Sequence, residues 1–271
     1  MSGTPITIKP GTLNGKNNLY DAKLSLIQPF FGELKRFEIQ YENWQELPSN
    51  IKDSLEIIII DDCGNPPIHT LMTRSKLKRC NFNLSIFRIT DNLKWNTPGA
   101  LNLGIMCAPT NWILIMDSDC LFESIEFGKL MNTAPLENWI YKFPRKRITN
   151  NSKWAKNDRY LPCTILFHKQ IFFNVNGFDE DFTGQWSGGY GFFDNHFDHK
   201  VRIAGYHCGQ IPWITAIEYM DDFVGPRIYR DHSRDHAINT NLMYEKMRNP
   251  EKNSKKMLRF NWELMFSKRR V

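Results

Sequence analysis

Four short apolar segments recur along the first half of the chain and alternate with longer mixed segments. They have the length and the Ile and Leu content that are typical of strands buried in a sheet. They are KLSLIQ (23–28), LEIIII (55–60), NLSIFRI (83–89) and WILIM (112–116). Because IIII at 57–60 has no polar position, it indicates a strand covered on both faces, although periodicity does not separate it from a buried helix segment.

Longer segments that mix apolar and charged residues separate these strands. ELKRFEIQYENWQEL (33–47) has the length of a surface helix and is closed by Pro48, and TPGALNLGIMCA (97–108) resembles a helix entered through Pro98. Alternating strands and helices predict βαβ units and a mostly parallel central sheet flanked by helices. The expected fold class is therefore α/β.

After residue 120 the pattern is less regular. It contains no repeat and no linker, which favours a single domain with an irregular C-terminal half. The expected elements are a strand at 163–167, a Gly-rich stretch at 184–191, a helix over about 193–204 and a polar, basic tail. We divide the single domain 1–271 into a nucleotide-binding half at about 22–120, a second half at about 121–248 and the tail at 249–271.

The composition fits one globular domain. Of 271 residues, 41% are hydrophobic and 24% are charged, so the chain can bury a substantial core. No apolar stretch reaches the roughly 18 residues that suggest a membrane span, and the N-terminus MSGTPITIKP lacks the apolar core of a signal peptide. The six cysteines include no C-x-x-C pair, so neither a zinc site nor a disulfide framework is indicated. These features predict a soluble, cytoplasmic protein.

The formal charge of +6 is concentrated in FPRKR (143–147) and SKRR (267–270). A positive balance suits an anionic ligand, and the basic tail could make peripheral contact with a membrane surface. Runs of this kind are more often solvated surface than binding sites.

Two of the predicted strands end in pairs of carboxylates. LEIIII runs into Asp61 and Asp62, and WILIM runs into Asp117 and Asp119. Open parallel sheets bind ligands beyond the carboxyl ends of their strands, so both pairs would lie on one edge. Crowded carboxylates repel one another unless a cation lies among them, and hard divalent ions bind carboxylate and phosphate oxygens. A metal-diphosphate site is the simplest explanation, with a strand-terminal turn or a helix N-cap as the alternative.

Four stretches in order resemble the metal-dependent glycosyltransferases of the GT-A fold, in particular the family 2 enzymes and the β-1,4-galactosyltransferase group. They are IIIIDDC (57–63), WNTPGALNLGIMCAPTNWILIMDSDC (95–120), NGFDEDFTGQWSGGYGFFDNHFDHKVRIAGY (176–206) and RDHSRDH (230–236). The resemblance covers about residues 22–248. It implies a Rossmann-like GT-A domain, a UDP-sugar donor, Mn²⁺ or Mg²⁺, and a glycan or other hydroxyl acceptor, and no nucleic acid.

The same resemblance implies roles for the four carboxylates at the strand ends. Asp61 and Asp62 would contact the uracil or ribose of the donor. Asp117 and Asp119 would hold the metal and the sugar nucleotide, with Asp119 as the preferred direct ligand.

In the second half, the resemblance points to a metal ligand, a base and a sugar-binding loop. His232 matches the histidine that ligates the metal, and His236 is the nearby alternative. Asp194 falls on the general base, which would accept the proton of the acceptor hydroxyl as it attacks with inversion. Trp186 would offer a stacking surface for a sugar, and Gly189 with its neighbouring glycines would allow a mobile loop, or the segment is a structural turn around a packed Trp.

The chain departs from the family pattern at three positions. Phe193 stands where a glutamate is usual, Tyr190 stands in place of a tryptophan, and Thr97 replaces a frequent arginine. These changes affect the regions that would recognise the acceptor and the diphosphate.

Two other classes remain as alternatives. MDSDC also resembles the strand end of haloacid-dehalogenase-type phosphatases, in which Asp117 would be the nucleophile and Asp221 or Asp222 would bind Mg²⁺, although Cys120 is not the Thr or Val expected there. A basic nucleic-acid-binding protein would use 143–147 and the tail, but it needs no carboxylates at strand ends.

Overall fold

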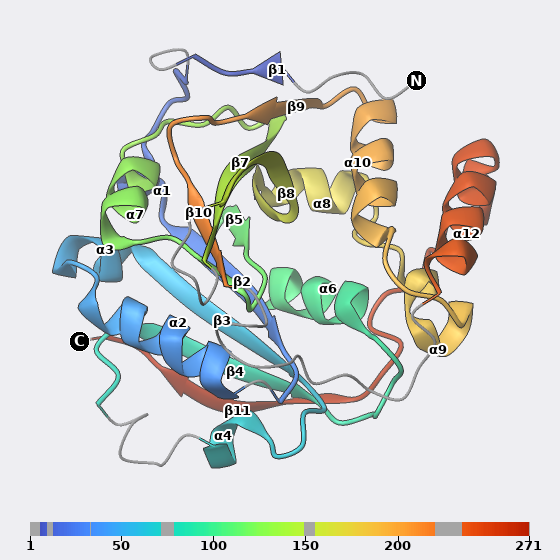
Figure 1. Cartoon of the computed structure of the whole chain (residues 1–271), viewed down its shortest axis with the longest axis horizontal. Helices are drawn as coiled ribbons and strands as arrows, with labels where there is room; N and C mark the ends of the chain where they lie inside the picture. The colour runs from blue at the N-terminus through green and yellow to red at the C-terminus, as the bar shows by residue number, and fades with distance from the viewer. Residues whose placement is uncertain are drawn as a thin grey trace.

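The computed structural model describes residues 6–9, 13–32, 34–71, 79–148, 155–219 and 235–270. Helices lie on both sides of a large central sheet (Figure 1). The strands are β1 (Ile6–Thr7), β2 (Leu24–Phe30), β3 (Leu55–Asp62), β4 (Asn83–Ile89), β5 (Trp112–Ile115), β6 (Cys120–Leu121), β7 (Trp139–Ile148), β8 (Ala155–His168), β9 (His207–Gln210), β10 (Ala216–Tyr219) and β11 (Trp262–Lys268). The helices are α1 (Leu19–Ala22), α2 (Leu34–Glu46), α3 (Ser49–Ser54), α4 (Ile68–Leu71), α6 (Thr97–Cys107), α7 (Ser124–Met131), α8 (Lys169–Asn174), α9 (Gly184–Ser187), α10 (Phe193–Ile203) and α12 (His236–Arg248), with short 3₁₀ helices η1 (Glu180–Phe182) and η2 (Pro250–Lys252). None of these described helices combines the length and the apolar character that crossing a membrane requires.

The first half of the chain has the predicted architecture. Its four apolar segments are β2 to β5, which pair in parallel in the order β4-β3-β2-β5. The helices expected between them at 33–47 and 97–108 are α2 and α6. Antiparallel pairing occurs where β8 lies between β5 and β7 and where β11 lies against β4. The prediction of an α/β fold with a mostly parallel central sheet is confirmed.

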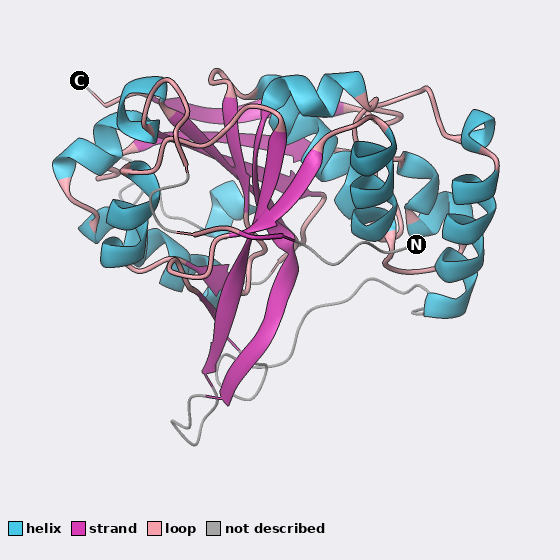
Figure 2. Cartoon of the chain, turned by 90° about the horizontal axis from the view of Figure 1, so that it is seen from above, coloured by secondary structure: helices cyan, strands magenta, loops and turns pink. Residues whose placement is uncertain are grey.

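The second half adds an arm of long strands. Close to the body, residues 139–142 of β7 pair with β9, whereas residues 145–148 pair with β10. The change of partner coincides with register shifts on both sides of Pro144, which has no N–H to donate to a ladder. Figure 2 shows the hairpin of β7 and β8 projecting from the body. The two-residue strand β6 joins this arm by pairing with β10.

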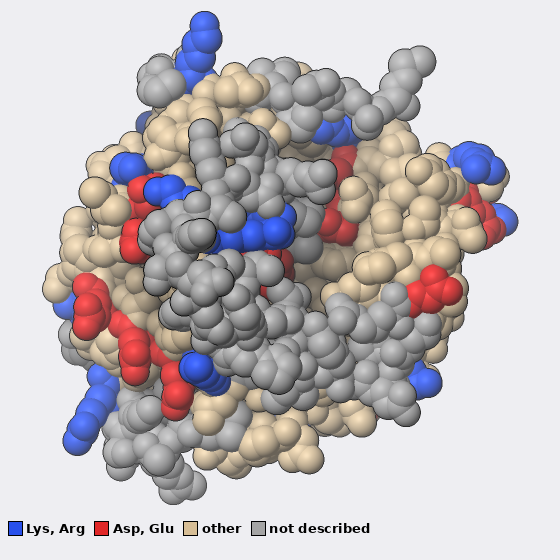
Figure 3. All heavy atoms as spheres, viewed as in Figure 1, with Lys and Arg blue, Asp and Glu red and all other residues tan. Residues whose placement is uncertain are grey.

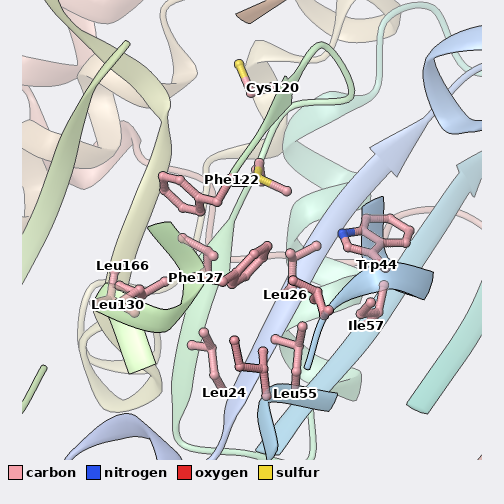
Figure 4. Packing of buried hydrophobic residues seen from close by; sticks show 14 of the residues in the cluster. Leu24, Leu26, Trp44, Leu55, Ile57, Cys120, Phe122, Phe127, Leu130 and Leu166 are labelled. Carbon is pink, nitrogen blue, oxygen red and sulfur yellow. The ribbon is translucent and has the colours of Figure 1, made fainter. Parts of the chain in front are cut away.

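The core consists of two apolar layers, one on each face of the sheet. Leu26 and Ile57 belong to the layer covered by α2, α3 and α7, and Figure 4 shows them close to Trp44 of α2. Their neighbours Ile27 and Ile58 belong to the layer covered by α6, α8 and α10. Successive residues of a strand point to opposite faces, so the uninterrupted run of isoleucines in β3 follows from burial on both sides.

The C-terminal segment contains a strand where the sequence suggested only a polar, basic tail. β11 pairs antiparallel with the edge strand β4. Arg269 forms an ion pair with Glu56, and Arg270 forms one with Asp53 at 3.0 Å. Lys268 Nζ donates to the carbonyl of Cys80 at 2.7 Å. The positive charges of this segment therefore lie against the sheet edge, where they help to fix the last strand.

Candidate functional site

Both acidic pairs lie at the carboxyl edge of the parallel strands. Asp61 and Asp62 are the last residues of β3, and Asp117 and Asp119 come two and four residues after the last residue of β5. β2 lies between these strands and pairs with both, so two strand spacings, about 10 Å, separate the two strand ends. This arrangement places four aspartates along one edge of the sheet, called the carboxylate rim below.

The two aspartates of the first pair have different surroundings. The Asp61 carboxylate is fully buried and accepts hydrogen bonds from the backbone N–H groups of Gly64 (2.7 Å) and Ile68 (3.0 Å). It also forms an ion pair with Arg88 at 2.6 Å. Asp61 thus fixes the loop that follows β3 from inside the protein. Asp62, which keeps 7% of its surface exposed, is the better placed of the two to contact a ligand.

The segment that carries the second pair is held by polar side chains from α2. Gln40 donates to the carbonyl of Cys120 and, at 3.4 Å, to that of Ser118. Asn43, one helical turn further along, donates to the carbonyl of Phe122 at 2.9 Å. Positions three and four apart lie on one face of a helix, so one face of α2 donates hydrogen bonds to the carbonyls of alternate residues of the segment. No pattern in the sequence indicates these hydrogen bonds.

A second set of backbone bonds ties Asp119 to the strand arm. The carbonyl of Asp119 accepts from the N–H of Tyr219 at 2.7 Å, and the carbonyl of Tyr219 accepts from buried Arg36 at 3.1 Å. Asp119 as a whole is 8% exposed, and its Oδ1 lies 3.4 Å from the Cys120 thiol. Burial, followed by the charge of Asp119, raises the pKa of the Cys120 thiol well above its usual value. That thiol stays protonated and can donate to the carboxylate.

Charged side chains of both signs surround this arm. Glu218 of β10 forms ion pairs with Arg145 (3.1 Å) and Arg147 (2.6 Å), which belong to the basic run 143–147. In Figure 3, acidic and basic side chains lie beside one another over the ends of β7 and β10 in the middle of the molecule. The run therefore contributes to strand pairing and has less free charge than its sequence suggests.

Asp194 lies in the first turn of α10, beside the end of β5. It lines a small apolar pocket together with Ile115, Leu101 and Phe193, and Ile115 is only two residues before Asp117. The fold thus brings the predicted base to the edge that carries the predicted metal ligands. Sequence spacing alone could not have shown this, because 77 residues separate Asp117 from Asp194.

The charge state of Asp194 is set by competing neighbours. Burial raises the pKa of its carboxyl group, the nearby Asp198 raises it further, and Lys142 and two backbone N–H groups act in the opposite direction. Lys142 of β7 forms an ion pair with Asp198. Burial lowers the pKa of Lys142, but Asp198 and then Asp194 outweigh this effect, and the net pKa is raised. A carboxylate with a raised pKa, next to a lysine that stays protonated, is suited to accept a proton.

The Gly-rich stretch is held against α12 more closely than expected for a mobile loop. A Cβ at Gly189 would lie 2.6 Å from Asn239 Oδ1 and 2.9 Å from Ile238 Cβ, so this position needs glycine for packing. The Asn239 amide nitrogen donates to the carbonyl of Gly191 at 2.9 Å. Gly191 has φ +78, a left-handed conformation that favours glycine. These glycines therefore have roles in packing and in the turn, and the mobile loop stays a prediction.

Trp186 is 40% exposed, as a sugar-stacking surface requires. The Arg259 guanidinium lies over its ring, 4.1 Å from the centroid, and forms an ion pair with Asp181 at 2.8 Å. One face of the indole is thus covered by a cation, which is a favourable contact in its own right. The prediction that Trp186 stacks on a sugar applies only to the other face.

The segment before α6 supports the Gly-rich stretch from the opposite side. The N–H groups of Gly184 and Gln185 donate to the carbonyls of Trp95 (3.2 Å) and Lys94 (3.0 Å). The Trp95 ring contacts Tyr190, with centroids 4.6 Å apart. Tyr190, which stands in place of the family's tryptophan, thus packs against Trp95, a contact that the sequence did not indicate.

The predicted metal-binding histidine His232 lies outside the described residues. The alternative, His236, begins α12, is exposed and contacts the rings of Tyr190 and Phe192 at 5.0 and 5.9 Å. Within the ranges that the structure describes, no three His, Cys, Asp or Glu side chains form a cluster able to hold a metal ion.

Comparison with known proteins assigns the chain. The family model for Glycosyl transferase family 2 matches residues 25–196, more than half of the chain. The dolichyl-phosphate beta-glucosyltransferase of Dictyostelium discoideum is 28% identical over 127 residues, which cover 45% of this chain and 38% of that protein. The match thus spans well under half of the relative's length.

Solved structures share the fold at low identity. TarS 1–349 of S. aureus in complex with UDP-GlcNAc gives a TM-score of 0.53 at 16% identity, covering 73% of this chain and 58% of that chain. The mannosyltransferase PcManGT of Pyrobaculum calidifontis, in complex with GDP-Man and Mn²⁺, gives a TM-score of 0.50 at 17% identity, with coverages of 72% and 56%.

Proposed function

The chain belongs to glycosyl transferase family 2 and has the GT-A fold, and we propose that it transfers a sugar from a UDP-sugar to an acceptor hydroxyl group with inversion. The observation that carries the proposal is the meeting of Asp62, Asp117, Asp119 and Asp194 at one edge of the sheet. The titles of the structural relatives name UDP-GlcNAc and GDP-Man with Mn²⁺, which supports a nucleotide-sugar donor and a divalent cation. The family assignment favours neither the phosphatase nor the nucleic-acid alternative.

The donor would lie across the carboxyl edge. Asp62 would contact the nucleoside, and Asp117 and Asp119 would face the diphosphate. Two aspartates just beyond a strand end, on a segment fixed from two sides, fit a hard divalent cation that also binds phosphate oxygens. Such a cation, Mn²⁺ or Mg²⁺, would stabilise the negative charge that grows on the leaving diphosphate. His232 is proposed as a further ligand.

Asp194 would act on the acceptor. As the bond from the sugar to the diphosphate breaks, the acceptor hydroxyl attacks the anomeric carbon from the opposite side and loses its proton. Asp194, partly buried and next to Lys142, would accept that proton. One displacement of this kind inverts the configuration at the anomeric carbon.

A donor panel with and without metal tests the proposal. We expect UDP binding, measured by calorimetry, to strengthen with Mn²⁺, and one UDP-sugar of a panel of UDP- and GDP-sugars to be slowly hydrolysed. Asp119→Ala should remove most of the metal effect, and His232→Ala should weaken it less. Asp21→Ala, which changes an exposed aspartate of α1, is the matched control. Equal UDP affinity of the wild type with and without metal would contradict the metal site. The cytoplasmic location remains a prediction.

A further inference from the structure

A second groove lies at the opposite edge of the sheet, where β5 begins. Its volume is about 470 Å³, within the range of small-molecule sites. It lies between the segment before α1, the start of β5, the turn before β7 and the end of β8, and its lining includes Asn17, Asn111, Trp112, Glu137 and Asn138. Five residues of strand, roughly 17 Å, separate Trp112 from Asp117. A ligand in this groove is therefore distinct from a donor at the carboxylate rim.

The rim of the groove is polar and its side chains are available. Within the described residues, the side-chain amides of Asn17, Asn111 and Asn138 make no hydrogen bond. The side chains of Lys16 and Glu137 also make none. Each amide offers both donors and acceptors. Lys16 and Glu137 contribute one charge of each sign, so the groove as a whole favours neither an anion nor a cation.

The groove also has apolar lining residues, and they are held in place by packing. Its apolar lining residues include Trp112, Pro135 and Leu136, of which Leu136 is the most exposed and Trp112 keeps only 5% of its surface exposed. The Trp112 ring packs edge-on against His168, with centroids 5.4 Å apart, and burial lowers the pKa of His168, which keeps the imidazole neutral near pH 7. Because His168 Nδ1 accepts from the N–H of Gln170 at 3.4 Å, its proton is on Nε2.

The backbone around the groove is fixed before any ligand arrives. The N–H of Gly15 donates to the carbonyl of Ala134 at 2.8 Å, and a Cβ at Gly15 would lie 2.3 Å from the carbonyl oxygen of Pro135. On the other side, the N–H of Lys169 donates to the carbonyl of Asn111 at 2.6 Å. A groove of fixed shape loses little entropy when it binds.

We propose that this groove is a binding site for a neutral oligosaccharide. A sugar ring presents C–H groups on its faces and hydroxyl groups at its edges, and each hydroxyl group both donates and accepts. These properties match a lining that combines apolar residues with side-chain amides and carries no net charge. A nucleobase would need a broad aromatic face, and Trp112 exposes too little of its ring for that. The groove would hold a glycan chain at a distance from the site of sugar transfer.

Calorimetric titration with maltohexaose, cellohexaose and chitohexaose tests the proposal without assuming the donor site. We expect saturable binding of at least one of them. The double variant Asn111→Ala/Asn138→Ala should bind it at least fivefold more weakly, since a lost hydrogen bond is worth about 1 kcal/mol. Asn50→Ala, which removes an exposed amide of α3, should bind like the wild type. Both replaced amides are exposed, so folding should be unaffected, and Asn138→Ala alone serves if the double variant is destabilised.

UDP titration separates this proposal from the proposed function. UDP affinity should be the same in the wild type and the groove variants. Binding of none of the three hexasaccharides, or equal binding by the groove variants, would overturn the groove proposal and leave the donor site untouched. Loss of UMP or UDP binding in the groove variants would assign the groove to a nucleotide and likewise overturn it.

Discussion

Thr183 Oγ1 donates a hydrogen bond to Asn96 Oδ1 across 3.2 Å, and this bond joins the start of the Gly-rich stretch to the turn before α6. Asn96 is fully buried, and its amide nitrogen lies 3.5 Å from Asp62 Oδ1. The same residue thus contacts the carboxylate proposed to bind the nucleoside and the stretch that leads to Asp194. Asn96 thus links the proposed nucleoside-binding residue Asp62 to the Gly-rich stretch by hydrogen bonds.

We predict that the hydrogen bonds of Asn96 couple donor binding to sugar transfer. Asn96→Asp keeps the acceptor for Thr183 but places a carboxylate against Asp62, so UDP affinity should fall severalfold. Thr183→Val keeps the side-chain shape and removes the donor, so the transfer rate should fall by about fivefold, the effect of about 1 kcal/mol, while UDP affinity changes little. Combining Asn96→Ala with Thr183→Val should give a non-additive loss of kcat/KM. Strict additivity of the two changes would argue that the bond has no energetic role.

Gln40 is predicted to position Asp119 through the backbone. Gln40→Met has similar volume and removes the bonds to the carbonyls of Ser118 and Cys120. Gln40 Oε1 has no partner among the described residues, so its removal relieves a desolvation cost and offsets part of the lost bonding. We therefore expect stability within about 2 kcal/mol of the wild type but a severalfold smaller effect of Mn²⁺ on UDP affinity.

Gln45→Met is the matched control for this prediction. Gln45 lies on the same helix but donates to Tyr41 at 2.7 Å, away from the carboxylate rim. Its replacement should leave the metal effect on UDP binding unchanged. A Gln40→Met protein that retained the full metal effect would show that the strand arm alone holds Asp119.

The sequence revealed those parts of the fold that depend on local apolar patterns. Strands such as β3 are short apolar runs, and a run without polar positions indicates a strand that is buried on both faces. The carboxylates that follow β3 and β5 could be placed on one edge because parallel strands end together. Burial and spacing within a strand sufficed for these inferences.

The remaining features depend on contacts between distant segments. β11 contains Trp262 and Leu264, which are 41% and 55% exposed, so its sequence shows no buried alternation, and only pairing with the β4 edge makes it a strand. The basic run 143–147 lies in β7, where Glu218 of the neighbouring strand β10 forms ion pairs with Arg145 and Arg147. Likewise, no local pattern could have shown that Arg259 covers Trp186.

Acid is predicted to destabilise the protein through His196. Burial, and then the charge of Lys200, lower the pKa of this buried histidine from 6.5 to about 4. The folded state therefore prefers neutral His196, while the unfolded chain gains a proton near pH 6.5. Stability is unaffected above that pH and falls as the pH drops from 6.5 to about 4, by up to about 3 kcal/mol.

Denaturant unfolding at pH 7, 5 and 4 measures this effect. His196→Gln keeps a donor for Asn253 Oδ1, which lies 3.0 Å from His196 Nε2, and it cannot be protonated. The variant should lose less free energy of unfolding between pH 7 and 4 than the wild type. His207→Gln, which changes an exposed histidine, should lose as much as the wild type. Identical pH profiles for wild type and His196→Gln would exclude His196 as the source.

Asp194→Asn is predicted to separate chemistry from binding. Asparagine keeps the shape and caps or hydrogen-bonds nearly as well at a helix start, so the fold and the UDP affinity should stay within a few fold of the wild type. Proton acceptance is lost, and the transfer rate should fall by about 10² to 10⁴. If Asp194 only served the helix start, the variant would transfer sugar at nearly the wild-type rate.

The neighbours of Asp194 should shift the acid limb of the kcat profile in opposite directions. The base works only when it is deprotonated, so the rate falls as the pH drops through its pKa, and a raised pKa moves that fall to higher pH. Asp198→Asn removes a like charge and frees Lys142 to face Asp194, so the pKa of Asp194 decreases and the limb moves to lower pH. Lys142→Met removes the cation and leaves Asp198 unpaired, so the limb moves to higher pH. Removal of a negative neighbour and removal of a positive neighbour must shift the pKa of the Asp194 carboxyl group in opposite directions. Shifts of the acid limb in the same direction in both variants would therefore contradict Asp194 as the titrating base.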